Sequence, residues 1–314
     1  MKAVFSLSKN LKFCFSKINL ETLKILRETT GAPLMKCKEA LEKFPSIDEA
    51  KQFLKEKNLI YAEKKSSNVS SQGIFSVTCN DDKCISVRFN SETDFVARNT
   101  DFLEFVANCT ERIAANGHLF NEPEMVLTDS ILRGIKMEDS DLLETQKLIT
   151  AKIQENIRIS TVFVQNLSAS EVCGVYVHQE VSPGLGPHFC SVVLEVTGLF
   201  DAQKMKNLAD EIAVLIFCKR PKYLTLETVD AEELKLAHSE IEKEISEKMR
   251  QEKPEICKEI VKGKIRKRFG EDVLYEQVVD FTGGEVLLKD YLREFHRENG
   301  YEVRVKEFVI KSIH

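Results

Sequence analysis

The sequence predicts an α+β protein, because the spacing of its apolar residues changes from helical to strand-like along the chain. Residues 20–60 carry apolar side chains every three or four positions, whereas residues 72–89 alternate between apolar and polar side chains. A plan of strand, strand and helix then occurs twice, with the copies separated by roughly a hundred residues. We therefore expect a three-helix module followed by two related subdomains, each an antiparallel sheet with a helix, and an antiparallel coiled-coil hairpin inserted in the second.

The three-helix module is predicted at residues 20–60. Gly31 and Pro45 interrupt the helical spacing and divide this region into three short helices. The polar residues 63–68 that follow are predicted to form a linker. About forty residues bury too little apolar surface for independent stability, so we expect the module to dock on another part of the chain.

The first related subdomain is predicted at residues 70–165. Its opening residues alternate in two short runs that flank the polar segment 80–83, which is typical of a β-hairpin. Helical spacing follows this hairpin, and a last alternating run closes the subdomain. The expected elements are strands at 74–78 and 85–89, helices at 101–115 and 140–155, and a strand at 159–164.

The second related subdomain is predicted at residues 166–314. Two alternating runs are joined by a segment in which Gly184 and Gly186 lie next to prolines, and this segment is predicted to be a hairpin turn. The order of strand, strand and helix is the same as in the first subdomain. The expected elements are strands at 173–178 and 189–196, a helix at 202–217, a helix at 287–298 and a strand at 301–310.

A coiled-coil hairpin is predicted at residues 231–270, between the helix of the second subdomain and its last strand. Ala237, Ile241 and Met249 belong to an apolar repeat of every three or four residues among charged residues. Pro254 then opens a second helix with the same narrow apolar stripe. Two such helices joined by a short turn can bury their stripes only against each other, which predicts an antiparallel pair.

The composition narrows the possible functions. The chain has 314 residues, of which 43% are hydrophobic, so it can bury ordinary cores. No segment approaches the roughly 18 consecutive apolar residues of a membrane helix, so we expect no membrane span. The net charge of −5 argues against a general nucleic-acid-binding protein, which normally carries an obvious basic excess.

Motifs for catalysis are missing from the sequence. It contains no phosphate-binding loop of the Walker type and no recognisable nucleophile motif. His178 and His188 fall on predicted strands, without a cysteine or acidic residue at metal-ligand spacing. We therefore expect a protein that is not an enzyme, has no cofactor, metal or small-molecule substrate, and works by binding.

The nine cysteines are scattered and include no Cys-x-x-Cys pair. Cys79 and Cys84 flank a polar turn, which favours a hairpin over half of a metal site. We expect all nine to be reduced thiols that pack as small apolar residues.

Residues 1–19 differ from the rest of the chain. They contain four lysines and several serines, and the first acidic residue is Glu21. Basic, hydroxyl-rich segments without acids are typical of organelle transit peptides, although such segments favour arginine and none is present here. The segment predicts import into the mitochondrial matrix, and the alternative is a disordered tail.

Two motifs identify a family. Residues 30–41, Thr-Gly-Ala-Pro-Leu-Met-Lys-Cys-Lys-Glu-Ala-Leu, resemble the first signature of the elongation factor Ts family. Residues 93–99, Thr-Asp-Phe-Val-Ala-Arg-Asn, resemble its second signature. A weaker similarity covers residues 151–157, and all three lie in the family's order.

The resemblance implies a guanine-nucleotide exchange factor for the GTPase elongation factor Tu, in its mitochondrial form. In this family the acidic and aromatic residues of the second signature wedge into the GTPase beside its magnesium site. The N-terminal module touches the same GTPase domain, and a strand histidine belongs to the same surface. The partner-binding residues implied for this chain are Thr93, Asp94, Phe95, Val96, Arg27, Leu34, Met35, Lys38 and His178.

Simpler interpretations stay open. Phe95, Leu34 and Met35 could pack into the protein's own core, and His178 could be an ordinary strand histidine. The three-helix module could be a ubiquitin-associated-like domain that binds another partner. The basic residues 262–268 could belong to an RNA-binding scaffold.

Overall fold

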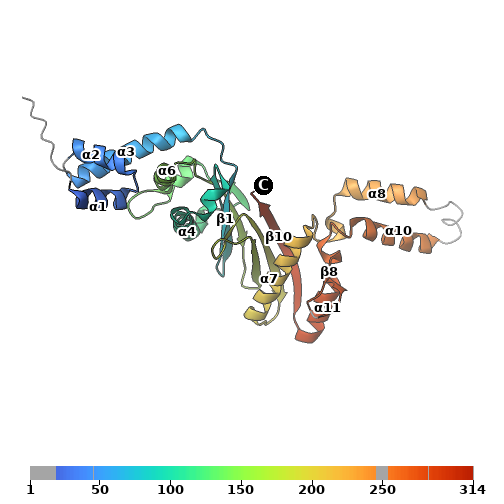
Figure 1. Ribbon diagram of the computed structural model, residues 1–314. Helices are drawn as coiled ribbons and strands as arrows, with labels where there is room; N and C mark the ends of the chain where they lie inside the picture. The colour runs from blue at the N-terminus through green and yellow to red at the C-terminus, as the bar shows by residue number, and fades with distance from the viewer. Residues whose placement is uncertain (1–18, 45, 245–253, 282, 314) are drawn as a thin grey trace, which may run out of the picture.

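The computed structural model describes residues 19–44, 46–244, 254–281 and 283–313. The predicted transit peptide at 1–19 therefore lies outside the described residues, apart from Asn19. Helices and antiparallel sheets are both present, which confirms the α+β class. Figure 1 shows the N-terminal helices at one end of the molecule, the sheets in the middle and a pair of helices at the far end.

The N-terminal region forms three helices, α1 (Leu20–Thr30), α2 (Leu34–Lys43) and α3 (Ile47–Lys65). Gly31 ends α1 in the left-handed conformation, with φ at 61°, and its N–H donates to the carbonyl oxygen of Arg27 at 2.8 Å. This confirms Gly31 as the stop between the first two helices. The helices enclose a small core made of Leu26, Ala32, Cys37, Ala40, Leu41, Ala50 and Leu54. The likeness to a ubiquitin-associated domain stays a prediction.

Helix α3 is longer than the sequence predicted, so the expected linker at 63–68 is wrong for its first residues. Residues 59–65 contain no glycine or proline and are mostly good helix formers, so the helix continues to Lys65. Helix α3 lies against α6 (Leu142–Ile153), with an ion pair of 2.7 Å between Lys55 and Glu144 and, in the extra turns, one of 2.9 Å between Lys147 and Glu63. The module thus docks on the first subdomain.

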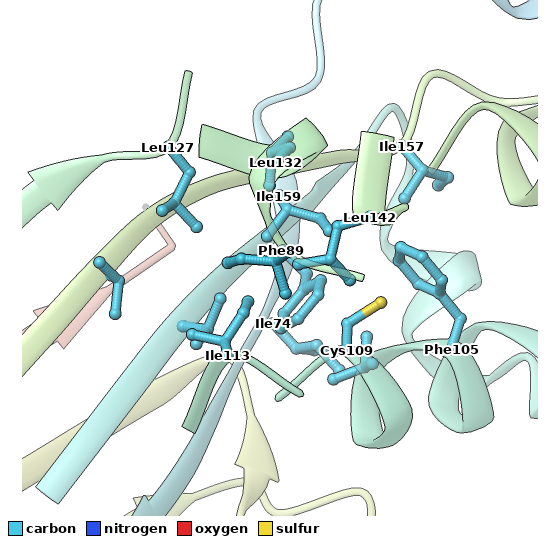
Figure 2. Packing of buried hydrophobic residues seen from close by; sticks show 14 of the residues in the cluster. Ile74, Phe89, Phe105, Cys109, Ile113, Leu127, Leu132, Leu142, Ile157 and Ile159 are labelled. Atoms are coloured by element: carbon cyan, nitrogen blue, oxygen red, sulfur yellow. The ribbon is translucent and has the colours of Figure 1, made fainter. Parts of the chain in front are cut away.

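The first sheet has five strands in the order β3-β4-β2-β1-β6. The strands β1 and β2 form the predicted hairpin, and the sheet packs against α4 and α6 in a core that Figure 2 shows from close by. Ile74, Phe89, Ile113 and Leu142 converge there from two strands and two helices. The elements are β1 (Gln72–Cys79), β2 (Lys83–Ser91), α4 (Thr100–Ala115), β3 (Glu124–Val126), α5 (Asp129–Gly134), β4 (Arg158–Asn166), β6 (Leu185–Gly186) and the 3-10 helices η1 (Asp94–Arg98) and η2 (Gly117–Leu119).

The second sheet has the order β10-β7-β5 and is covered by α7. Close packing of α7 requires a glycine on β5, because a Cβ atom at Gly174 would lie 2.1 Å from the carbonyl carbon of Ala209. The elements are β5 (Glu171–His178), β7 (His188–Thr197), α7 (Ala202–Lys219), η3 (Leu226–Thr228), η4 (Leu274–Glu276), β8 (Val278–Val279), β9 (Val286–Leu287), α11 (Leu288–Asn299) and β10 (Glu302–Ser312).

A short strand connects the two sheets where the sequence predicted only a hairpin turn. Leu185 and Gly186 form β6, which pairs with Ser76 and Phe75 of β1. Phe75 and Phe189 then meet edge to face, with their ring centroids 5.0 Å apart. The connection between β5 and β7 therefore belongs to the first sheet as well as to the second subdomain.

Helices α8 (Ala231–Glu244) and α10 (Pro254–Phe269) lie side by side in Figure 1. Residues 245–253, which include Met249 of the predicted apolar repeat, lie outside the described residues. The coiled-coil hairpin therefore stays a prediction. The described parts of the pair share a core that contains Ala237, Ile241, Cys257, Val261 and Ile265.

One cysteine pair contradicts the expectation of nine reduced thiols. Cys79 and Cys84 form a disulfide across the β1–β2 hairpin. The hairpin register pairs the two residues directly and brings their Cα atoms to 4.0 Å, a consequence of strand pairing that residue spacing alone did not reveal. The other cysteines among the described residues, which lie outside this disulfide, are Cys37, Cys109, Cys173, Cys190, Cys218 and Cys257.

Candidate functional site

The segment between β2 and α4 presents one aromatic side chain to solvent. Phe95 is 82% exposed, whereas its neighbour Val96 is only 5% exposed and packs into the first core. Among the described residues, Phe95 is the only exposed Phe or Tyr. The alternative that Phe95 packs into the protein's own core is therefore wrong. Aromatic side chains contribute much of the binding energy at protein interfaces, so an exposed Phe on a turn that is fixed at both ends is a candidate binding anchor.

The turn is fixed on its N-terminal side by a carboxylate from a distant part of the chain. Thr93 donates twice to Glu155, from its backbone N–H to Oε2 at 2.9 Å and from its hydroxyl to Oε1 at 2.7 Å. Ser91 Oγ donates to the carbonyl oxygen of Thr93 at 2.7 Å. Hydrogen bonds to a charged group are stronger than neutral ones, so this end of the turn is held firmly.

The C-terminal side of the turn is fixed by the start of α4. Asn99 donates its backbone N–H to the carbonyl oxygen of Val96 at 2.9 Å, and its side-chain Oδ1 accepts from the N–H of Phe102 at 3.2 Å. Asn99 is thus the N-cap of α4. Asp94 opens the 3-10 helix η1 and is exposed.

A second carboxylate connects the turn to the end of α3. Glu92 accepts from the backbone N–H of Asn156 at 2.6 Å, from Asn68 Nδ2 at 3.1 Å and from Lys65 Nζ at 3.3 Å. Partial burial of Glu92 raises the pKa of its carboxyl, but these hydrogen bonds and the charge of Lys65 outweigh it and leave the pKa below its usual value. The N-terminal module and the exposed turn thus share one hydrogen-bonded network.

Sequence reasoning missed both anchoring carboxylates as members of the site. Glu155 and Asn156 lie within the weaker similarity at residues 151–157, which was the one available signal. Glu92 directly precedes the second signature. Glu92 contacts Asn68, which is 24 positions away in the sequence, and Glu155 contacts Thr93, which is 62 positions away.

The predicted contact residues of the N-terminal module lie on its surface. Leu34 is 48% exposed and Met35 is 71% exposed at the start of α2, so the alternative that they are core residues is wrong. Lys38 is one turn further along the same helix, and Arg27 lies in the last turn of α1; both are exposed. Two apolar and two basic side chains are therefore available on this module.

His178 has internal partners. It is the last residue of β5 and is half-buried. Its Nδ1 lies 3.0 Å from the Tyr176 hydroxyl, and its ring stacks on Phe217 with centroids 4.7 Å apart. These contacts fit an ordinary strand histidine, and the predicted contact between His178 and a partner stays a prediction.

Within the described residues, the one group of three side chains close enough to hold a metal ion consists of Cys79, Cys84 and Cys173, of which the first two are disulfide-bonded. In the same part of the chain, no helix is both long enough and apolar enough to cross a membrane.

The chain matches known proteins over most of its length. The family model described as "Elongation factor TS" matches residues 92–309, a region that includes Phe95 and His178. Elongation factor Ts of Rickettsia rickettsii is 32% identical over 301 residues, which cover 94% of this chain and 92% of the relative. Elongation factor Ts of Ehrlichia canis is 32% identical over 264 residues, or 83% and 87% of the two chains.

Another similar protein has the word mitochondrial in its name. It is "Elongation factor Ts, mitochondrial 2" of Paramecium tetraurelia, which is 30% identical over 269 residues, or 84% of this chain and 85% of the relative. The family model covers the motif at residues 93–99 but not the one at 30–41, and it and the relatives give the same family as the two motifs. The chain belongs to the elongation factor Ts family.

Proposed function

We propose that this protein is a guanine-nucleotide exchange factor in translation elongation. It binds elongation factor Tu with GDP bound and promotes GDP release, without catalysing a chemical reaction itself. The observation that carries the proposal is the 82% exposed Phe95 on a turn that Glu155 and Asn99 hold at both ends. Membership of the elongation factor Ts family supports the choice of partner.

The mechanism we propose is a wedge. Phe95 enters an apolar pocket of the GTPase next to its magnesium site, and the carboxylate of Asp94 accompanies it. Mg²⁺ requires near-ideal octahedral geometry while it bridges the nucleotide phosphates to the protein. A displacement of the surrounding helices by roughly an ångström removes ligands from the ion and loosens GDP. Val96 and Thr93 are the base of the wedge, because one packs into the core and the other binds Glu155.

Binding and release are coupled. If the factor weakens nucleotide binding, nucleotide weakens binding of the factor by the same ratio. A thousandfold effect corresponds to about 4 kcal/mol of coupling free energy. One buried aromatic anchor contributes on the order of 2 kcal/mol or more, so a single wedge residue supplies a large share of that coupling.

A second contact surface on the N-terminal module adds affinity. Leu34 and Met35 are exposed next to the basic side chains of Lys38 and Arg27. This module shares the Glu92 network with the wedge, so both surfaces can meet one partner in a defined relative position. We assign this surface to binding and the turn at 93–96 to the release step.

The RNA-binding alternative receives little support from the charges of α10. Lys262 pairs with Glu259 at 2.8 Å, and Arg268 pairs with Glu240 of α8 at 2.5 Å. Acidic partners on the same and the neighbouring helix neutralise part of the basic stretch. A scaffold for nucleic acid would need an uncompensated basic face.

The ubiquitin-associated-like alternative explains only the first helices. It assigns no role to the anchored Phe95 turn, which lies outside that module. A pulldown with the full chain separates the three possibilities, because a GTPase of the elongation factor Tu type, ubiquitin or RNA would be recovered.

We also propose the mitochondrial matrix as the location. The basic, hydroxyl-rich residues 1–19 and the mitochondrial relative from Paramecium support this proposal. Fusion of residues 1–19 to a reporter protein should direct the reporter to mitochondria. A reporter that stays in the cytosol would favour the disordered-tail alternative.

Release of labelled GDP from mitochondrial elongation factor Tu tests the exchange function. We expect the full chain to accelerate release in a saturable way and to form a stable complex with the nucleotide-free GTPase. A release rate that stays at its spontaneous value, at concentrations well above that of the GTPase, would overturn the proposal.

A further inference from the structure

Three cysteine sulfur atoms meet at the junction of the two sheets. Cys79 and Cys84 are disulfide-bonded across the β1–β2 hairpin of the first sheet, and Cys173 lies on β5 of the second. All three sulfur atoms lie within 4.8 Å of one another. Neither family membership nor the proposed exchange function gives this cluster a role.

The cluster is partly buried and partly accessible. Cys84 and Cys173 are buried together against Val193 of β7, whereas Cys79 lies nearer the surface. A cavity of about 400 Å³ lies beside them, and Cys79, Cys173 and Lys206 are among its lining residues. Cys173 thus faces both a disulfide and a cavity.

We propose that Cys79, Cys84 and Cys173 form a thiol–disulfide exchange site. The thiolate of Cys173 attacks Sγ of Cys84, so that a bond between Cys84 and Cys173 forms while the bond between Cys79 and Cys84 breaks. Cys79 leaves as a thiolate and takes up one proton, which balances the proton that Cys173 lost. The exchange consumes no oxidant or reductant.

The position of the three residues favours this direction of attack. Cys84 shares a buried cluster with Cys173. Cys79 is nearer the surface, where water stabilises a leaving thiolate better than an apolar environment does. Cys84 is therefore the sulfur that is attacked, and Cys79 is the leaving group.

Exchange changes what the disulfide connects. The bond between Cys79 and Cys84 closes a hairpin with a sequence separation of 5. A bond between Cys84 and Cys173 would connect the first sheet to the second and close a far longer loop. Longer loops restrict the unfolded chain more, so the migrated bond should raise the thermal midpoint of unfolding.

Proton loss from Cys173 limits the rate. Burial raises the pKa of Cys173 to about 12, the nearby charge of Lys206 lowers it, and the carboxylates of Asp210 and Glu307 raise it. Only the thiolate is nucleophilic, so the exchange rate should rise about tenfold per pH unit well below that pKa. Exchange at this site is therefore slow at neutral pH, and a change that admits water to the cavity should alter its rate.

Tryptic peptides distinguish the two bonds. Cleavage after Lys83 separates Cys79 from Cys84, and Cys173 falls in a peptide that spans residues 159–204 together with Cys190. The oxidised full chain is incubated without added thiol at about pH 7, 8 and 9, its free thiols are blocked in denaturant, and the linked peptides are measured by mass spectrometry. The matched control variant is Cys190→Ser, because Cys190 is also buried and lies in the same peptide.

At first we expect the peptide that contains Cys84 to be linked to the peptide that contains Cys79. With time it should become linked to the peptide of residues 159–204, and the rate of this change should rise about tenfold per pH unit. Cys190→Ser should keep both linkages, whereas Cys173→Ser should keep only the first. The proposal is wrong if the first linkage never forms, if it alone is present at every pH, or if the second persists in Cys173→Ser. It is equally wrong if Cys190→Ser removes the second linkage.

Discussion

Two connections between a strand and the following helix each expose one large apolar side chain. In the first, Phe95 is 82% exposed between β2 and α4; in the second, Leu199 is 98% exposed between β7 and α7. Exposure alone would rank Leu199 above Phe95. The surroundings of the two residues differ, and this difference separates a binding anchor from a surface residue.

Both connections end at a helix N-cap, Asn99 before α4 and Asp201 before α7, but the longer Phe95 connection is also held by the distant carboxylate of Glu155. Phe95 lies in the 3-10 helix η1, which begins at Asp94, and Thr93, the residue before this helix, donates to Glu155. Leu199 follows Gly198, whose φ of 100° is readily available only to glycine, and the connection contains no 3-10 helix. A side chain that is already fixed loses less conformational freedom on binding, and an aromatic ring buries more area.

The largest expected effect is that of Phe95→Ala on GDP release. Truncation of a central aromatic anchor costs about 2 kcal/mol or more of binding, which corresponds to a drop of at least roughly tenfold in stimulated release. Because the ring is exposed, the thermal midpoint of unfolding should stay at the parental value. Nucleotide-release kinetics together with a thermal melt measure both quantities. Parental release by this variant would contradict the wedge.

An intermediate effect is expected for Glu155→Gln. The amide removes the negative charge and keeps only one acceptor oxygen for the two hydrogen bonds that Thr93 donates. Phe95 itself is unchanged, so release should fall by a smaller factor than in Phe95→Ala, with a modest loss of thermal stability. Stimulation curves for the two variants under identical conditions make the comparison. If Glu155→Gln lowered stability but left release untouched, the anchoring of the turn would be irrelevant to exchange.

The double variant Leu34→Ala with Met35→Ala should change affinity more than the release step. Deletion of residues 20–59 is a poorer test, because α3 packs on α6 and its loss would disturb the scaffold. We expect a several-fold higher concentration for half-maximal stimulation and a plateau close to the parental one. Contacts made equally with nucleotide-bound and nucleotide-free partner change affinity only. Titration against GDP-loaded partner measures both quantities, and a lowered plateau at unchanged half-maximal concentration would reverse the assignment.

The smallest effect is expected for Leu199→Ala. This residue lies in the connection between β7 and α7 and is 98% exposed, so both stability and release should stay at parental values. Release kinetics with this variant serve as the control for Phe95→Ala. A loss of release as large as that of Phe95→Ala would show that exposure, and not anchoring, selects the functional residue.

The spacing of apolar residues determined the type and order of most elements. The hairpin at 72–91, the helix at 202–219 and the closing strand at 302–312 all lie within a few residues of their predicted positions. These patterns are local, because a helix repeats every 3.6 residues and a strand every two. The two motifs at 30–41 and 93–99 also determined the family, since both can be read without knowledge of the fold.

Only the tertiary structure decided which residues meet. The exposure of Phe95, the contact between Thr93 and Glu155 at a separation of 62, and the pairing of Leu185 with β1 all depend on segments far apart in the sequence. The approach of Cys173 to the disulfide is of the same kind. The spacing of apolar residues predicts which side chains lie on the same face of a helix or strand. Whether that face is buried, anchored or left in water depends on what packs against it, and this is a property of the whole chain.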